Sequence, residues 1–438
     1  MWNTEDINLL SGGFAQSIYR RFFQCTAWLL YGIARVCHFL KLRYNAEHMR
    51  MEEIQYHHMI SKIVVTVKFV FVLLDLQSYL VLILVLWLHI FRVENSGGQN
   101  YMIGLLVQGL IISDLRRIFI FLHSFDDRKL IKHIINEIFY ITQTIKRKFG
   151  MIYHFEMCLL CVYSSKLYLV YIMLDSMWYH MTFIWINFLY WLLLEYCILG
   201  YFIYQLILLN WYRNFSYFLQ RFLEYNRYQS CISAHYHGRL LWLFKLHLRI
   251  INLHKCIQER VAWLPAAIYL TIFTSIFNMT LLLECIIYSD DEIEDKMYII
   301  ADGSLGPALI PILNVLVVGI CTDRIRSEES ALQQQIILAN ILCVRKADPN
   351  DFRLKVLNNE VSYEIRLMSA YNIFPHDYHT ALIVHQKLEP LHNVIILHTI
   401  GDREFAFDYF LTVIVTALSF IQYTVSTNRV YKVCVTHK

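Results

Sequence analysis

Charge and proline are both scarce in this chain. Only 17% of its 438 residues are charged, against about 25% in a typical soluble domain, while 57% are hydrophobic. All six prolines lie after residue 264, so nothing in the first 264 residues forces a helix to break. The composition excludes an ordinary soluble globular domain and predicts an all-α integral membrane protein.

The chain also lacks the patterns that mark several functional classes. Its 11 cysteines are scattered, and Cys158 and Cys161 form a C-x-x-C spacing inside an apolar run without a second ligand pair. Neither a zinc site nor a disulfide framework is therefore predicted. A Walker loop, a clustered His/Asp metal site and a basic run with interleaved aromatic residues are all missing from the sequence. We expect no enzyme activity, no metal or other cofactor, and no nucleic acid partner.

Long apolar runs are what the chain has in abundance. A bilayer core about 30 Å thick needs about 20 apolar residues per helix, and this rule predicts seven transmembrane helices. They are Phe69–Phe91, Tyr101–Leu122, Ile152–Leu174, Thr182–Leu209, Ala262–Tyr288, Met297–Ile320 and Phe405–Val425. The earlier patch Phe22–Leu40 is interrupted by Gln24 and Arg35, so we interpret it as a short pre-helix at the interface, with an extra span as the alternative. Met1–Gly13 is polar and acidic, so no cleavable signal peptide is expected.

Lysine and arginine indicate the orientation of these spans. They concentrate before the first span and in the second and fourth loops, whereas the first and fifth loops hold only Arg92 and Lys296 and the third loop holds none. By the positive-inside rule, the N-terminus is cytoplasmic and the C-terminus extracellular. This orientation is the reverse of that of G-protein-coupled receptors.

The spans divide the chain into seven regions. These are the cytoplasmic N-terminal region with the pre-helix (1–68), spans one to four (69–212), a cytoplasmic helical extension (213–261), spans five and six (262–322), a cytoplasmic helical anchor region (323–404), the seventh span (405–425) and an extracellular tail (426–438). Arg213–Trp263 mixes charged with apolar residues, and Asp323–Glu404 begins with a polar helical run, Arg324–Ile341. Both stretches are predicted to form amphipathic helices that pack together beneath the membrane.

The seventh span is apolar all round except for one polar stripe. At 100° per residue, the stripe occupies an arc of roughly 80°. It consists of Asp408, Thr412, Thr416, Ser419 and Tyr423, with Gln422 on its edge. In hydrocarbon a polar stripe must meet another helix or water. Several copies around an axis would line a pore, whereas the alternative is a seam of hydroxyl hydrogen bonds between two helices.

Charged residues inside the other spans each cost at least about 2.5 kcal/mol at the bilayer centre unless paired or wetted. Asp114 and Arg117 lie three apart on one helical face, so they are predicted to neutralise each other. Lys166 and Glu195, on adjacent spans, are predicted to pair across the bundle.

The external ends of the spans hold aromatic and acidic side chains that suit a pocket for a small apolar or amphipathic ligand. We place Trp178, Trp185, Phe277, Glu284, Tyr298 and Asp302 there, with interfacial or core packing as the alternative for the aromatic residues. Pro307 and Pro311 are expected to kink the sixth span. The kink would act as a hinge that moves the last helix when ligand binds, and a static bend is the alternative.

The seventh span ends in the frame Val415-Thr416-Ala417-Leu418-Ser419-Phe420-Ile421-Gln422-Tyr423. This frame resembles the signature of the insect gustatory receptors, which are seven-helix ligand-gated cation channels related to the insect odorant receptors. The signature reads Thr-Tyr, five hydrophobic residues, Gln and usually Phe. Gln422 and the spacing match, Tyr423 is an aromatic residue in the Phe position, and Val415-Thr416 departs from Thr-Tyr. Upstream, Leu388-Glu389-Pro390-Leu391 and Gly401–Asp408 resemble the family's lead-in to this span.

The resemblance implies a homo- or heterotetramer in the plasma membrane of chemosensory neurons, surrounded by membrane lipid, with the last helix of each subunit lining a central cation pore. Gln422 and Tyr423 would form the constriction, and the cytoplasmic extensions would pack as a shared anchor. Asp408 would form a carboxylate ring at the cytoplasmic mouth. The ligand would be a non-volatile tastant, with bitter compounds as the default.

Each of these roles has an alternative reading. In the alternative interpretation, Gln422 would pack against a neighbouring helix and Tyr423 would belong to an interfacial aromatic belt. Asp408 would then be a solvated anion at a helix N-terminus. For the whole protein, the alternatives are a seven-helix G-protein-coupled receptor or a membrane transporter. The first would carry Asp-Arg-Tyr after the third span and Asn-Pro-x-x-Tyr in the last, and neither is present.

Overall fold

A computed structural model describes most of the chain from residue 128 onward. It covers 128–150, 157–178, 182–226, 234–261, 263–287, 294–345 and 403–436, the strands of hairpins within 42–53 and 395–400, and isolated helical positions between 21 and 84. The predicted span Tyr101–Leu122, with Asp114 and Arg117, lies outside the described residues. Within Phe69–Phe91, the described apolar side chains of Val70, Leu73, Leu80 and Leu84 are exposed.

The described residues form a helical structure, as the composition predicts. Its helices are α5 (Arg128–Lys148), α6 (Met157–Trp178), α7 (Thr182–Asn226), α8 (Ala234–Val261), α9 (Trp263–Ile287), α10 (Glu294–Arg345) and α13 (Arg403–Thr436). Two short antiparallel hairpins depart from the all-α prediction. They are β1 (Leu42–Asn45) with β2 (Arg50–Glu53), and β3 (Ile395–Ile396) with β4 (Thr399–Ile400).

Two helices are much longer than a membrane span. The 45-residue α7 continues from the predicted fourth span into the extension, and the 52-residue α10 joins the predicted sixth span to the polar run after it. No proline or glycine lies between Leu209 and Asn226, or between Ile320 and Arg345, so nothing in either stretch ends the helix. The predicted boundaries at 212 and 322 therefore fall inside unbroken helices.

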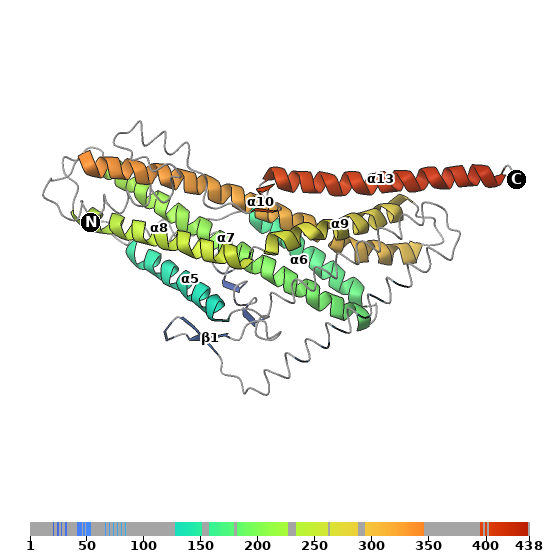
Figure 1. The fold of residues 1–438 in the computed structure, drawn as a ribbon, viewed down its shortest axis with the longest axis horizontal. Helices are drawn as coiled ribbons and strands as arrows, with labels where there is room; N and C mark the ends of the chain where they lie inside the picture. Colours follow the sequence, from blue (N-terminus) through green and yellow to red (C-terminus); the bar gives the residue numbers. More distant parts are fainter. Residues whose placement is uncertain are drawn as a thin grey trace.

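One end of the molecule is a bundle made of α5, α8, the second half of α7 and the second half of α10 (Figure 1). We call it the anchor bundle. Its centre holds Trp211, Tyr212 and Phe215, all fully buried, and its core joins residues of α8 to Leu332 and Ile336 of α10. The predicted packing between the two amphipathic stretches is present for the described part of the second, up to Arg345, while their cytoplasmic location stays a prediction.

The anchor bundle also contains α5, which lies in the loop between the second and third predicted spans. α5 is amphipathic, with Ile134, Ile138, Ile141 and Ile145 spaced four and three residues apart on the side that faces the core. It ends at Lys148, and two residues later Gly150 has a φ of 76°, a left-handed conformation that a glycine adopts without strain. Phe149, just before it, packs edge-on against Phe215 of α7.

A second core lies beside the first and is made by α9, the first half of α10 and α13, with a contribution from α7. Two stretches of the described helices are long and apolar enough to cross a bilayer, Leu305–Ile336 and Arg403–Tyr423, and they overlap the predicted sixth and seventh spans. Within the 18-residue apolar segment that qualifies each stretch, 72% of the first is buried inside the chain, but only 33% of the second. The last helix therefore has most of its surface free for lipid, water or another chain.

Candidate functional site

The last helix packs on the rest of the chain through a single face. Ala406, Tyr409, Val413, Ala417, Phe420 and Ile421 are buried. Their spacing of three and four residues places them on one side of a helix. This side lies against α9 and α10.

The polar stripe of α13 lies outside this packed face. Asp408, Thr412, Ser419, Gln422 and Tyr423 are exposed, and Thr416 is partly exposed. The hydroxyls of Thr412 and Ser419 each donate to the carbonyl four residues earlier in their own helix, both at 2.7 Å. Their oxygens can still accept hydrogen bonds from water. Most of the stripe is therefore exposed beside the described helices of the single chain.

The start of α13 bears on the role of Asp408. The helix begins at Arg403, and its acidic first-turn residue is Glu404. Asp408 lies in the second turn, beyond the reach of the dipole at the helix N-terminus. Arg403 is paired with Asp323 of α10 at 3.1 Å, which offsets the unfavourable position of a cation at a helix start.

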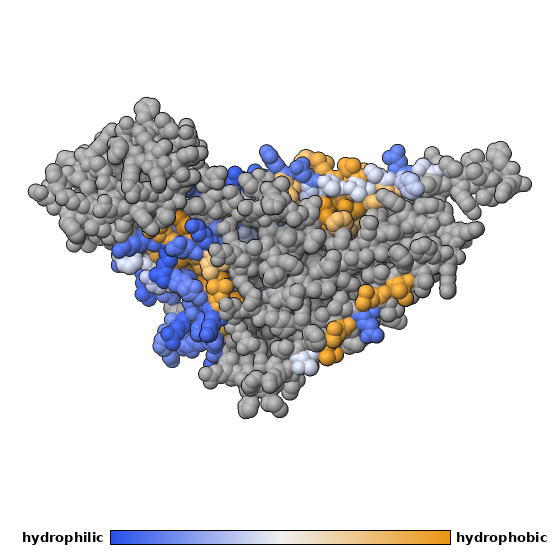
Figure 2. Space-filling view, viewed as in Figure 1, coloured by the Kyte–Doolittle hydropathy of each residue, from blue (hydrophilic) through white to orange (hydrophobic). Residues whose placement is uncertain are grey.

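A third side of α13 is apolar and exposed. It is formed by Phe407, Leu411, Val415 and Leu418, of which Phe407 is 59% exposed. On the face drawn in Figure 2, α13 shows hydrophobic and hydrophilic side chains side by side. Such a side is stable only against lipid tails or another protein chain.

Deep in the helical assembly, three polar side chains from three helices bind one another in a closed ring. The ammonium of Lys166 on α6 pairs with Oε2 of Glu195 on α7 and donates to Oδ1 of Asn314 on α10 at 2.6 Å. The Asn314 amide nitrogen donates to Oε1 of Glu195 at 2.8 Å. The predicted pairing of Lys166 with Glu195 is thus confirmed, and Asn314 is a member that the sequence reading missed.

The two prolines of α10 lie beside a contact between helices. α10 is helical through both Pro307 and Pro311, and whether they act as a hinge stays a prediction. The hydroxyl of Ser275 on α9 donates to the carbonyl of Ala308. Pro311 leaves the carbonyl of Pro307 without its helical donor, and Ser275 donates to the next carbonyl along the chain.

Most of the residues predicted to bind ligand lie near helix ends, whereas Phe277 lies in the middle of α9. Phe277 of α9 has a partly buried side chain, while the side chains of Trp178, Trp185, Glu284, Tyr298 and Asp302 lie outside the described part of the structure. The ends of α6 and α9 and the starts of α7 and α10 all lie at the side of the molecule away from the anchor bundle (Figure 1). The pocket itself stays a prediction.

Comparison with known proteins identifies the family. A protein described as gustatory receptor-like 43a from Drosophila melanogaster is 47% identical to this chain over 438 residues, which is 100% of this chain and 98% of the relative. The chain belongs to the insect gustatory receptor family. No protein-family model matches it. The receptor is therefore a transmembrane chemoreceptor of a seven-helix family and not an enzyme, and the resemblance inferred from its last helix is confirmed.

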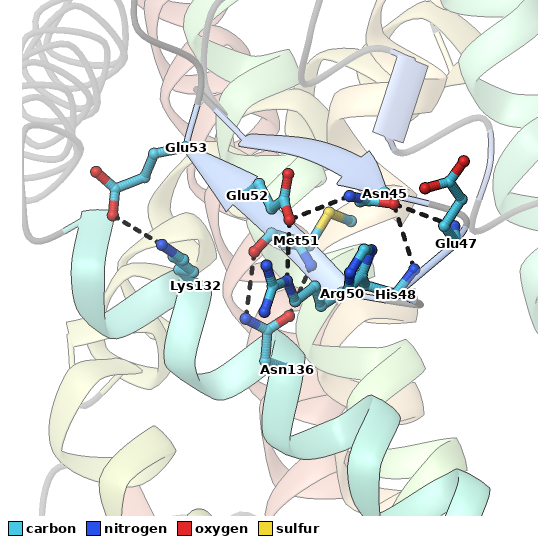
Figure 3. Close-up of polar contacts among 9 residues, drawn as sticks. All are labelled: Asn45, Glu47, His48, Arg50, Met51, Glu52, Glu53, Lys132 and Asn136. Carbon is cyan, nitrogen blue, oxygen red and sulfur yellow. Dashed lines mark hydrogen bonds and ion pairs between the residues drawn. The ribbon is translucent and has the colours of Figure 1, made fainter.

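The N-terminal part of the receptor docks on α5 through the hairpin of β1 and β2 (Figure 3). Met51 is the residue of β2 that faces α5: its N–H donates to Oδ1 of Asn136 at 2.7 Å, and its carbonyl accepts from Nδ2 of Asn136 at 3.3 Å. The side-chain amide of Asn136 thus makes the two hydrogen bonds to Met51 that the backbone of a neighbouring strand would otherwise make. This caps the free edge of the hairpin.

Further contacts fix the hairpin on both sides. Lys132 of α5 pairs with Glu53 at 3.3 Å, and the ring of Tyr44 lies 5.7 Å from that of Phe139. On the other edge, the Tyr44 N–H donates to the hydroxyl of Tyr31 at 3.2 Å. The hairpin is therefore tied to the anchor bundle through α5.

Asn136→Ala is expected to release this hairpin. The variant leaves both backbone groups of Met51 without their partner, which costs about 1–3 kcal/mol per unsatisfied group. Hydrogen exchange at the Met51 amide should therefore accelerate. Lys129→Ala, an exposed change on the same helix, is the control and should leave exchange at Met51 unchanged; equal protection in the two variants would contradict the docking role of Asn136.

An ion pair holds α5 against α8 in the receptor. Arg249 donates to both carboxylate oxygens of Glu137, at 2.5 and 2.7 Å, and its guanidinium lies 4.0 Å from the centre of the Tyr140 ring. The hydrogen bonds from Arg249 hold the pKa of Glu137 below its usual 4.5. Because the pKa of Glu137 is lowered in the folded state, the ion pair contributes its full stabilisation at pH values above the pKa of Glu137 in the unfolded chain. This stabilisation is lost as the pH falls through the lowered pKa of the folded state.

Proposed function

We propose that the receptor is a subunit of a ligand-gated cation channel in which α13 lines the pore. The observation that carries the proposal is that α13 packs through one face while its polar stripe, from Asp408 to Tyr423, stays exposed. A polar stripe on a helix long enough to span a bilayer must meet water or polar groups. A pore on an assembly axis supplies that water.

Several copies of the chain are needed to close such a conduit, because each chain contributes one copy of α13. The family resemblance implies four copies. The exposed apolar side of α13, with Phe407, Leu411 and Val415, would then face lipid or the adjoining subunit. In this arrangement the packed face contacts α9 and α10, the polar stripe contacts water, and the apolar side contacts lipid or the adjoining subunit.

The stripe suggests distinct roles along its length. Asp408 of each subunit would contribute to a carboxylate ring that attracts cations at the cytoplasmic mouth. Gln422 and Tyr423 lie near the other end of the stripe, where a ring of aromatic side chains would close the passage by excluding water. A small non-volatile tastant would bind on the side of the molecule away from the anchor bundle, with Trp178, Trp185, Phe277, Glu284, Tyr298 and Asp302 around it. Binding there would favour a wider constriction and depolarise a chemosensory neuron.

The test is whole-cell recording of the receptor, alone and with other gustatory receptor subunits, during ion replacement and a panel of tastants. Asp408→Asn should lower the preference for cations over anions, and Tyr423→Ala should raise the resting current. Leu411→Ala and Val415→Ala, on the apolar side of the same helix, are the controls and should leave permeation unchanged. Unaltered permeation in Asp408→Asn and Tyr423→Ala at normal surface expression would remove the pore assignment.

The orientation is tested separately. We propose a cytoplasmic N-terminus and an extracellular C-terminus, on the strength of the basic residues in the even-numbered loops. An epitope after Lys438 should be detected on intact cells. Detection only after permeabilisation would overturn this topology.

A further inference from the structure

Two hydroxyl-bearing residues one turn apart on α9 bind two different helices. The Thr271 hydroxyl donates to the carbonyl of Ile268 at 2.5 Å, so its oxygen is left to accept from the hydroxyl of Tyr409 on α13, 3.2 Å away. The Ser275 hydroxyl donates to the carbonyl of Ala308 on α10. All of these side chains are buried. The helix α9 is thus joined by buried hydrogen bonds to the proposed pore helix and to α10.

The contact with α10 falls where that helix is weakest. Pro311 has no N–H to offer the carbonyl of Pro307, and its ring crowds the turn before it. Ala308, which accepts from Ser275, lies three residues before Pro311, and Asn314, which closes the ring with Lys166 and Glu195, lies three residues after it. α10 is therefore held to α9 on one side of this proline and to α6 and α7 on the other.

Apolar contacts of α13 specify its position less closely than a hydrogen bond does. Val413, Ala417 and Phe420 meet α9 and α10 through apolar surfaces, which are non-directional. The pair of Arg403 with Asp323 is largely exposed, and exposed pairs contribute little. A buried hydrogen bond with defined donor and acceptor, such as that of Tyr409 with Thr271, fixes an orientation.

We propose that Thr271 and Ser275 are positioning residues that make the orientation of α13 follow that of the proline segment of α10. A displacement of α10 at Ala308 moves Ser275, and the same stretch of α9 carries Thr271 and with it Tyr409. The link to ligand gating rests on the proposed channel function, but the mechanical coupling between these helices does not.

Hydrogen exchange of the full-length receptor in lipid nanodiscs tests the coupling without a ligand or a current. Ser275→Ala removes a hydrogen bond to α10 and none that the structure describes to α13, so a purely local role would leave α13 unchanged. We expect exchange of the α13 amides between 413 and 423 to accelerate about fivefold or more, the lower end of typical coupling between sites. Thr271→Val and Tyr409→Phe each remove the hydrogen bond to α13 and should produce the same change, and combining them should add nothing.

The matched control is Thr280→Val. Thr280 is also buried on α9, but its hydroxyl donates to the carbonyl of Ile276 in its own helix at 2.8 Å. This variant should leave exchange in α13 unchanged, and Thr271→Ser, which keeps the hydroxyl, should restore wild-type exchange. Thermal unfolding measured in parallel identifies variants that are merely less stable.

Two outcomes separate this inference from the channel proposal. If Ser275→Ala affects α13 no more than Thr280→Val does, the positioning role is wrong, whatever the receptor conducts. If exchange in α13 rises in Ser275→Ala and Thr271→Val while resting and tastant-evoked currents stay unchanged, the positioning role stands and α13 does not control permeation.

Discussion

Replacing Glu195 by leucine should lower the free energy of unfolding of the receptor by about 3–5 kcal/mol, because it leaves a buried cation without its counter-charge. Lys166 pairs with Glu195 in the interior of the helical assembly, where the two side chains are only 12% and 10% exposed, and its other described hydrogen-bond partner, Asn314, is uncharged. The measurement is the fraction of detergent-solubilised receptor that stays monodisperse after heating. Glu224→Leu, an exposed change on the same helix, is the control and should shift stability by no more than about 0.5 kcal/mol.

Removing both charges should be far less damaging than removing one. In Lys166→Met/Glu195→Leu no charge is left uncompensated, and buried pairs replaced by apolar residues are often neutral in stability. Asn314 loses both of its partners in this double variant, so adding Asn314→Leu should recover further stability. A double variant as unstable as Glu195→Leu alone would show that the pair itself, and not the isolated charge, is what matters.

Trp211→Ala should be the most damaging single change in the anchor bundle, lowering the free energy of unfolding by about 3–5 kcal/mol. Trp211 has no exposed surface, and its neighbours Tyr212 and Phe215 are buried with it, so the shortened side chain leaves a cavity that a packed core cannot close. Thermal unfolding of the purified receptor measures the effect. Trp242→Ala, a tryptophan of α8 that is 39% exposed, provides the comparison, and an equal loss in both would contradict the importance of burial.

The ring of Lys166, Glu195 and Asn314 shows how far sequence reasoning reaches inside a membrane protein. An unpaired ionisable side chain in an apolar span costs free energy, so its presence predicts a partner of opposite charge. The sequence then has to indicate only which oppositely charged residue lies nearby. This reasoning correctly paired Lys166 with Glu195. A neutral asparagine carries no comparable cost, so nothing in the sequence marked Asn314 as the residue that completes the ring.

The anchor bundle shows contacts that could not be predicted from the sequence. The isoleucines of α5 are spaced as an amphipathic helix requires, yet the basic residues among them are equally typical of a cytoplasmic loop between two spans. The hairpin that Asn136 holds was not foreseen at all, since the pairing of one asparagine with a strand edge 85 residues earlier leaves no periodic pattern. Such contacts depend on which surfaces meet after the helices have packed.

Composition, the length of the apolar runs and the motif around Gln422 and Tyr423 were sufficient to identify a helical membrane chemoreceptor, because transfer of a polypeptide into hydrocarbon depends on residue type and length alone. The polar stripe of α13 was equally readable, since helical periodicity places its residues on one side. The sequence left open which side of α13 packs, that α7 and α10 run unbroken into the anchor bundle, and that α9 binds both α10 and α13. These features were decided by tertiary structure, because they depend on the fit between surfaces that lie far apart along the chain.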